Sequence, residues 1–152
     1  MIKPPLSHPG TGRHASVIRA EDLWDCEPIS VAEGCYVLFM ASYRQAQLSK
    51  VEAARAWVEA GAVYVCAWGP NSPEIEETFD YASFLPEFGE PLPFTLMTTS
   101  HSDELLEEAL WFAFYNGKAP HEVGDGSCPV VVVVDSQALE EQATAWVQGN
   151  TE

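Results

Sequence analysis

The chain has 152 residues, carries a formal net charge of −16, and is 47% hydrophobic. This length suits one domain with a sizeable core, and the composition excludes wholesale disorder. The sequence has no apolar run long enough to cross a bilayer and no signal-peptide core at its N-terminus, so we expect a cytoplasmic protein.

The charge is distributed unevenly along the chain. The first twenty residues contain Lys3, Arg13 and Arg19 and no acid, whereas from Asn71 onward sixteen acidic residues stand against Lys118 alone. Such a field disfavours nucleic acid and anionic membranes as partners and favours fast encounter with a basic protein. Plain solubility is the open alternative explanation of the same charge.

Two parts of the chain differ in composition. Residues 1–34 are rich in Pro and Gly at first and then acidic, which predicts an N-terminal arm with Trp24 as its anchor. We expect His8 and His14 in this arm to be solvated. Residues 35–152 are predicted to form a single α/β domain.

The predicted elements of the domain alternate. Continuous apolar runs predict strands at 35–41, 63–68, 94–98 and 129–134. Helices are expected to begin at Ser49 with a capping box, at Ser72, after a Thr-Thr-Ser-His turn, and at Asp135 or Ser136. With no hairpin signal, the order β-α-β-α-β-α-β-α predicts a three-layer sandwich around a mostly parallel four-stranded sheet, in the flavodoxin-like strand order 2-1-3-4.

One candidate site is the edge at which parallel strands end, because open α/β sheets bind ligands there. We name it the strand-end rim, and its candidate residues are Arg44, Trp68, Asn71, Thr98, Thr99 and His101. There Arg44 and helix N-termini would hold a small anion, and His101 would act as a base. The alternative is that these residues only build turns and helix caps.

Known catalytic and metal signatures are missing from the sequence. It contains no GxGxxG after a strand, no GxxxxGK[ST], no HExxH and no GxSxG. Its four cysteines lack metal-ligand spacing, so neither a metal nor a cofactor is expected. The missing motifs argue against nucleotide or dinucleotide enzymology without excluding it, and between an enzyme and a non-enzymatic protein we favour the latter.

The helix after the Thr-Thr-Ser-His turn has two contrasting faces. A helical wheel places its core face on Leu105, Leu106, Ala109, Leu110, Phe112 and Ala113. The opposite face carries Trp111 and Tyr115 among Glu104, Glu107 and Glu108, which is unusual for a solvated surface. Three explanations stay open: a surface for a basic partner, cover by the arm through Arg13 and Arg19, or a homodimer.

Two segments resemble a family of small bacterial proteins known as a domain of unknown function. They are VYVCAWGP (63–70) and MTTSHSDELLEEALWF (97–112), and the resemblance spans residues 35–147. The matching positions are Trp68, Gly69, Pro70, Thr98, Thr99, His101, Glu107, Glu108, Trp111 and Phe112. The resemblance implies a bacterial source and no particular activity.

From these observations we expect an acidic protein-binding factor, such as an inhibitor or immunity-type protein for a basic target. The alternative is a protein or enzyme that binds a small anionic ligand at the strand-end rim.

Overall fold

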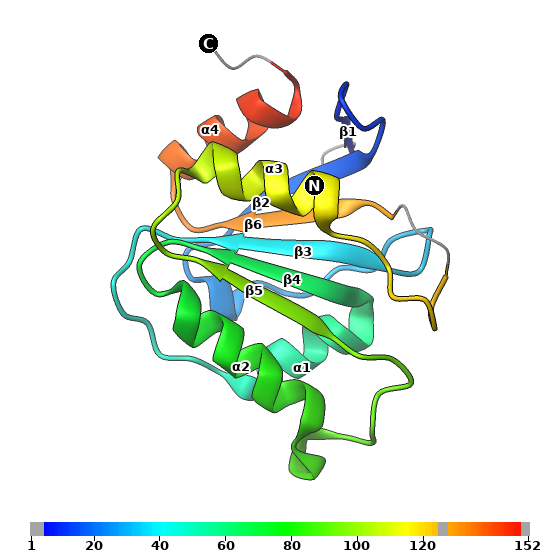
Figure 1. Cartoon of the computed structure of the whole chain (residues 1–152). Coiled ribbons are helices and arrows are strands. Elements are labelled where there is room, and N and C mark those ends of the chain that lie inside the picture. The colour runs from blue at the N-terminus through cyan, green and yellow to red at the C-terminus, as the bar shows by residue number, and fades with distance from the viewer. Residues whose placement is uncertain (1–4, 125–127, 150–152) are drawn as a thin grey trace.

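The computed structural model describes residues 5–124 and 128–149, and within them a mixed α/β fold is built on one six-stranded sheet (Figure 1). Its strands are β1 (Leu6–Ser7), β2 (His14–Arg19), β3 (Tyr36–Ala41), β4 (Ala62–Trp68), β5 (Met97–His101) and β6 (Val130–Val134). Its α-helices are α1 (Val51–Ala60), α2 (Ser72–Phe84), α3 (Leu106–Asn116) and α4 (Gln137–Val147), and Leu23–Asp25 and Pro86–Phe88 form short 3₁₀ turns.

The predicted strand count and strand order are wrong. The sheet order is β1-β2-β6-β3-β4-β5. The strands β2, β6, β3, β4 and β5 are parallel to one another, and β1 is antiparallel to β2. The four predicted strands correspond to β3, β4, β5 and β6 in chain order, and in the sheet they lie in the order 4-1-2-3. The last of them, β6, does not extend the sheet beyond β5 but pairs with β3 on its other side. Strand β2, from the segment predicted as an arm, then pairs with the other side of β6.

Helices cover both faces of the sheet. Helices α3 and α4 lie on one face and α1 and α2 on the other (Figure 1). The central strand β6 is five consecutive valines, all fully buried. A strand covered on both faces has no solvent side, which explains why the main strands read as continuous apolar runs.

Local boundaries correct several predictions. Thr98–His101 is strand rather than turn, because β5 begins three residues later than predicted and the chain before it forms a loop. The expected capping box at Ser49 is absent, since Lys50 is the N-cap of α1 and makes no side-chain capping bond. The cap at Ser136 is confirmed: its Oγ accepts from the backbone N–H of Leu139 at 3.2 Å.

Candidate functional site

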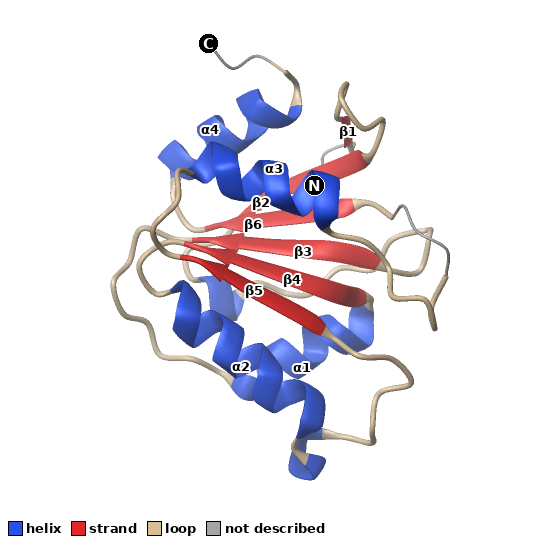
Figure 2. Ribbon diagram, viewed as in Figure 1, coloured by secondary structure: helices blue, strands red, loops and turns tan. Residues whose placement is uncertain are grey.

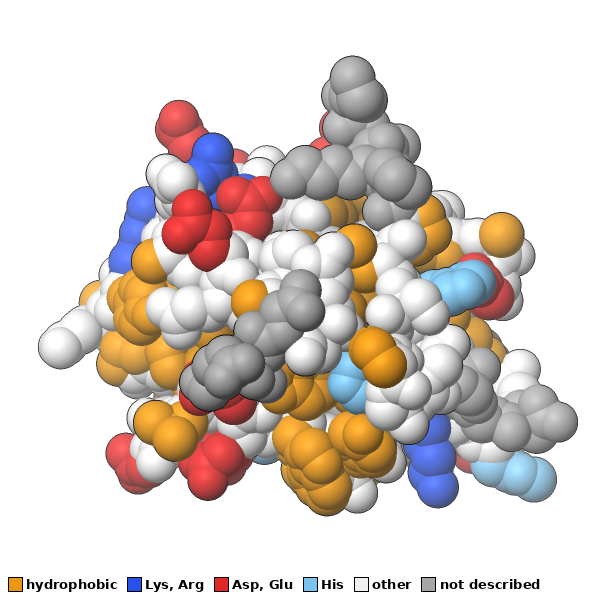
Figure 3. Space-filling model, turned by 90° about the horizontal axis from the view of Figure 1, so that it is seen from above, with side chains coloured by type: hydrophobic (Ala, Val, Ile, Leu, Met, Phe, Trp, Pro, Cys, Tyr) orange, Lys and Arg blue, Asp and Glu red, His pale blue; other side chains and the backbone are white. Residues whose placement is uncertain are grey.

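The outward face of α3 carries two exposed aromatic rings. Trp111 is 52% exposed and Tyr115, one turn later, is 46% exposed. The rings stack with centroids 4.9 Å apart and planes 19° from parallel. Glu104, Glu107 and Glu108 are also exposed beside them. We call these five residues the aromatic–acidic face; hydrophobic and acidic side chains lie close together on the side of the molecule that bears α3 and α4 (Figure 3).

The opposite side of α3 anchors the helix. Its buried residues are Leu106, Ala109, Leu110, Ala113 and Phe114. The helical wheel wrongly placed Leu105 in the core, because this residue precedes the first turn as the N-cap and is exposed. It also missed Phe114, and Phe112 is only partly buried. The burial of this inward stripe leaves Trp111 and Tyr115 on the solvent side.

The acidic residues of this face differ in their partners. The Glu108 carboxylate accepts from the backbone N–H of Leu105 at 3.0 Å and so caps the start of α3. The carboxylate of Glu104 lies 2.9 Å from Nδ1 of His101. Among the described residues, no Lys or Arg forms an ion pair with Glu104, Glu107 or Glu108. Their negative charge is therefore not balanced by a neighbouring described cation.

The two described arginines of the N-terminal segment do not cover this face. Arg13 is buried and donates to the backbone oxygens of Phe114 at 2.9 Å, Gly117 at 2.6 Å and Cys128 at 2.8 Å. A guanidinium at this end of α3 also complements the negative end of the helix dipole. Arg19 instead lies 3.5 Å from Glu140 of α4.

His8 is buried, contrary to the expectation that it is solvated. Its ring stacks on Trp146 at 4.8 Å, contacts Phe114 at 4.9 Å, and meets Tyr115 edge-on at 5.8 Å. Nδ1 accepts a hydrogen bond from the backbone N–H of Thr11 at 3.1 Å. Burial, and secondarily the nearby Arg13, lower the pKa of His8. The N-terminal segment therefore packs, through His8, against Phe114 and Tyr115 of α3.

At the strand-end rim, His101 belongs to a polar network. Its Nε2 lies 2.9 Å from Oγ1 of Thr99, and its Nδ1 lies 2.9 Å from the Glu104 carboxylate. The ring is buried against Phe112, with centroids 5.0 Å apart. The indole N–H of Trp68 donates to the backbone oxygen of Glu104 at 2.9 Å, which holds the segment before α3 in place.

The remaining rim candidates do not gather around His101. Thr98 points to the opposite face of the sheet and donates to Asp80 of α2 at 2.7 Å. Arg44 pairs with Asp22 at 3.1 Å and lies 3.6 Å from the buried Asp135 carboxylate. Asn71 is buried at the start of α2, and its Nδ2 has no described partner.

Two aromatic rings occupy the middle of the rim. Tyr43 and Trp68 meet edge-on with centroids 5.5 Å apart. Beside them Gly69 adopts φ +116°, and a Cβ at this position would lie 2.0 Å from the backbone oxygen of Ser42. Only glycine fits this turn. The rim is thus a set of separate polar clusters around an aromatic pair.

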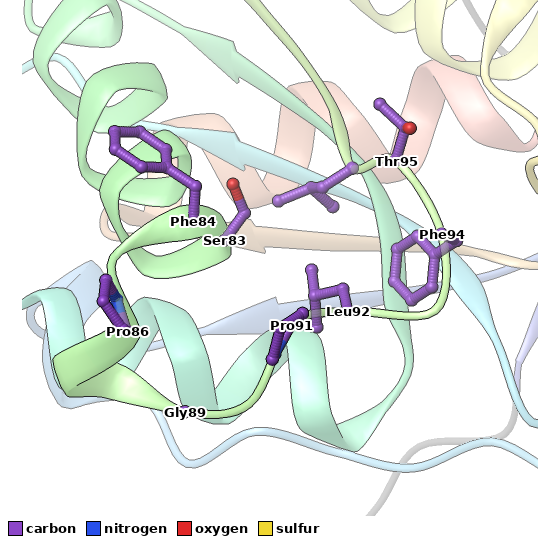
Figure 4. Close-up of a pocket in the computed structure, with 9 residues that line it drawn as sticks. Ser83, Phe84, Pro86, Gly89, Pro91, Leu92, Phe94 and Thr95 are labelled. Carbon is purple, nitrogen blue, oxygen red and sulfur yellow. The ribbon is translucent and has the colours of Figure 1, made fainter.

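A hollow of about 370 Å³ lies away from the rim, at the end of α2 and before β5. The side chains around it come from the last turn of α2 and from the proline-rich segment that leads to β5 (Figure 4). They are Ser83, Phe84, Pro86, Gly89, Pro91, Leu92, Phe94, Thr95 and Leu96. No sequence motif pointed to this hollow, since its residues read only as a loop.

No group of three or more His, Cys, Asp or Glu side chains among the described residues is positioned to hold a metal ion. Burial raises the pKa of the Cys66 thiol to about 12. None of the helices that these residues form is long and apolar enough to span a membrane.

Comparison with known protein families gives one assignment. Residues 17–149 match the model of a family described as a domain of unknown function, DUF7684. The chain belongs to this family. The DUF7684 domain includes the second half of β2 and all of α4, and so extends beyond the expected limits of 35 and 147 at both ends. No curated protein and no solved structure matches the chain.

Proposed function

We propose that this DUF7684 protein is a non-enzymatic, acidic protein-binding factor of the bacterial cytoplasm, and that it binds a basic protein through the aromatic–acidic face. The observation that carries the proposal is the exposure of Trp111 and Tyr115 as a stacked pair beside three glutamates. Trp and Tyr are enriched among the residues that contribute most to binding at protein interfaces.

The charge supports a basic partner rather than a second copy. Glu104, Glu107 and Glu108 have no ion pair with a described Lys or Arg, and a homodimer along α3 would bring these carboxylates against their own copies. A basic surface would gain favourable charge pairs there and would be steered to the face by its field. An inhibitor or immunity-type protein with a basic target fits this chemistry.

Affinity capture from a lysate of the source bacterium tests the proposal. The bait would be the wild-type protein, the Trp111→Ala variant, and Leu48→Ala as a control that removes an exposed apolar side chain elsewhere. We expect a basic protein to be captured by the wild type and by the control, to be lost from Trp111→Ala, and to be released by added salt. Recovery of the same proteins by all three baits would contradict the proposal.

A second candidate function is binding or conversion of a small anionic ligand at the rim. One observation favours it: the imidazole of His101 lies between the Thr99 hydroxyl and the Glu104 carboxylate. A carboxylate at Nδ1 favours the tautomer whose Nε2 can accept a proton. Thermal unfolding with phosphate or citrate tests it: stabilisation lost in His101→Gln supports this function, and an unchanged midpoint contradicts it.

A further inference from the structure

The outer edge of β5 is open. In the described part of the chain β5 pairs only with β4, whereas the short antiparallel strand β1 lies beyond β2 at the opposite edge (Figure 2). β5 contains no proline or lysine and pairs with β4 without a bulge, so three common protections of an edge strand are absent from it. Such a strand offers its free backbone groups to another extended chain.

The direction of the backbone identifies the free groups. The backbone oxygen of His101 accepts from the N–H of Gly69, which follows β4, so the backbone of His101 faces β4. Backbone groups alternate in direction along a strand. The N–H and C=O of Thr98 and Ser100 therefore face outward.

Exposed apolar side chains flank this edge. Phe84 of α2 is 63% exposed and meets Tyr81 edge-on with centroids 6.0 Å apart, and Met97 at the start of β5 is about half exposed. Phe84 also lines the hollow of about 370 Å³ next to the strand. An extended chain that pairs with β5 could place an apolar side chain from one of its own ends in this hollow.

The charge around the edge selects the kind of chain. The Thr98 hydroxyl donates to Asp80 and lies 3.3 Å from Glu76, so two carboxylates of α2 lie directly below β5. The sequence has no lysine or arginine between Arg55 and Lys118, and the buried Arg55 is held by Glu59 and by the backbone oxygens of Ala82 and Glu90. A second copy paired edge to edge would bring these carboxylates together.

From these observations we propose that the β5 edge binds an extended, lysine- or arginine-bearing segment of another protein as an added strand, with one apolar side chain of that segment in the adjacent hollow. This surface is separate from the aromatic–acidic face, and the proposal does not depend on the function assigned to that face.

A designed peptide tests the proposal on the full chain. The probe is fluorescein-Lys-Val-Lys-Val-Lys-Val-Lys-Leu-amide, and the control peptide has Glu in place of every Lys. Fluorescence anisotropy should show binding of the Lys peptide only. We expect Ser100→Pro, which removes one outward N–H and leaves the bonds to β4 intact, to weaken binding about fivefold. Phe84→Ala should weaken it about tenfold, and Leu48→Ala, which removes an exposed apolar side chain elsewhere, should leave it unchanged.

Amide hydrogen exchange on the wild-type protein gives a readout that needs no variant. The peptide should slow exchange at Thr98 and Ser100, since both amides would become hydrogen-bonded. Absence of binding, or binding without this protection, would overturn the proposal. So would a wild-type dimer in sedimentation that Ser100→Pro dissociates, because the edge would then belong to a second copy.

Discussion

The indole of Trp111 stacks on the phenol ring of Tyr115, and both rings remain about half exposed although the same helix buries five other side chains. On the inner side of α3, Phe114 is almost completely buried and contacts His8 and Trp146. Aromatic residues on one helix therefore have different roles, and stability measurements can separate them.

Trp111→Ala should change the free energy of unfolding by less than about 1 kcal/mol, because half of the side chain is already in water. Phe114→Ala should lower it by about 3–5 kcal/mol, since it removes a ring from the core. Urea unfolding of the two variants checks this contrast. A loss of several kcal/mol for Trp111→Ala would mean that the indole serves the fold.

Arg13→Ala should destabilise the protein by about 3 kcal/mol, because three backbone oxygens would lose a charged donor inside the protein. Arg19→Ala is the matched control, since it removes a partly exposed pair with Glu140, and it should cost less than about 1 kcal/mol. The free energies come from urea unfolding at neutral pH. Equal losses in the two variants would rule out the special role of Arg13.

His8 should make the protein less stable as the pH falls. Its folded-state pKa is lowered below the ordinary 6.5, so below that pH the unfolded chain binds more protons than the folded one. Stability is therefore lost as the pH drops from 6.5 toward the folded pKa. In His8→Phe, which keeps an aromatic ring, the midpoint of thermal unfolding should fall less between pH 7.5 and pH 5.5. Identical pH profiles for the two proteins would contradict this linkage.

Gly69→Ala should lower the free energy of unfolding by at least about 2 kcal/mol, because its Cβ would meet the backbone oxygen of Ser42 in a backbone region unfavourable for L-residues. Gly12→Ala is the control, since Gly12 also has a positive φ but no atom within 4 Å of the added Cβ. Chemical denaturation compares the two variants. A smaller loss for Gly69→Ala than for Gly12→Ala would show that the turn relaxes easily.

Much of the α/β architecture is predictable from the sequence, because strands covered on both faces must be apolar throughout. The runs at Tyr36–Ala41, Ala62–Trp68 and Val130–Val134 were predicted to within one residue at each end. Strand β2, with the sequence HASVIR, was not predicted because its pattern is partly polar and lacks a continuous apolar run. The strand order was wrong because sequence periodicity does not determine where a crossover returns to the sheet.

The candidate sites were predictable only where one helix determines them. The wheel separated Trp111 and Tyr115 from the core because both faces belong to a single segment. It misassigned Leu105 because the start of the helix was placed too early. The contact of Arg13 with the end of α3 joins residues about a hundred positions apart, and no local pattern reports such a contact.

The affinity of the protein for a purified basic partner obtained by capture tests the central claim most directly. Calorimetric titration would compare the wild type with Trp111→Ala and Leu48→Ala. The account predicts that Trp111→Ala weakens binding at least about thirtyfold, as expected for a central aromatic residue, while Leu48→Ala binds within about twofold of the wild type. Equal affinities for all three proteins would contradict it.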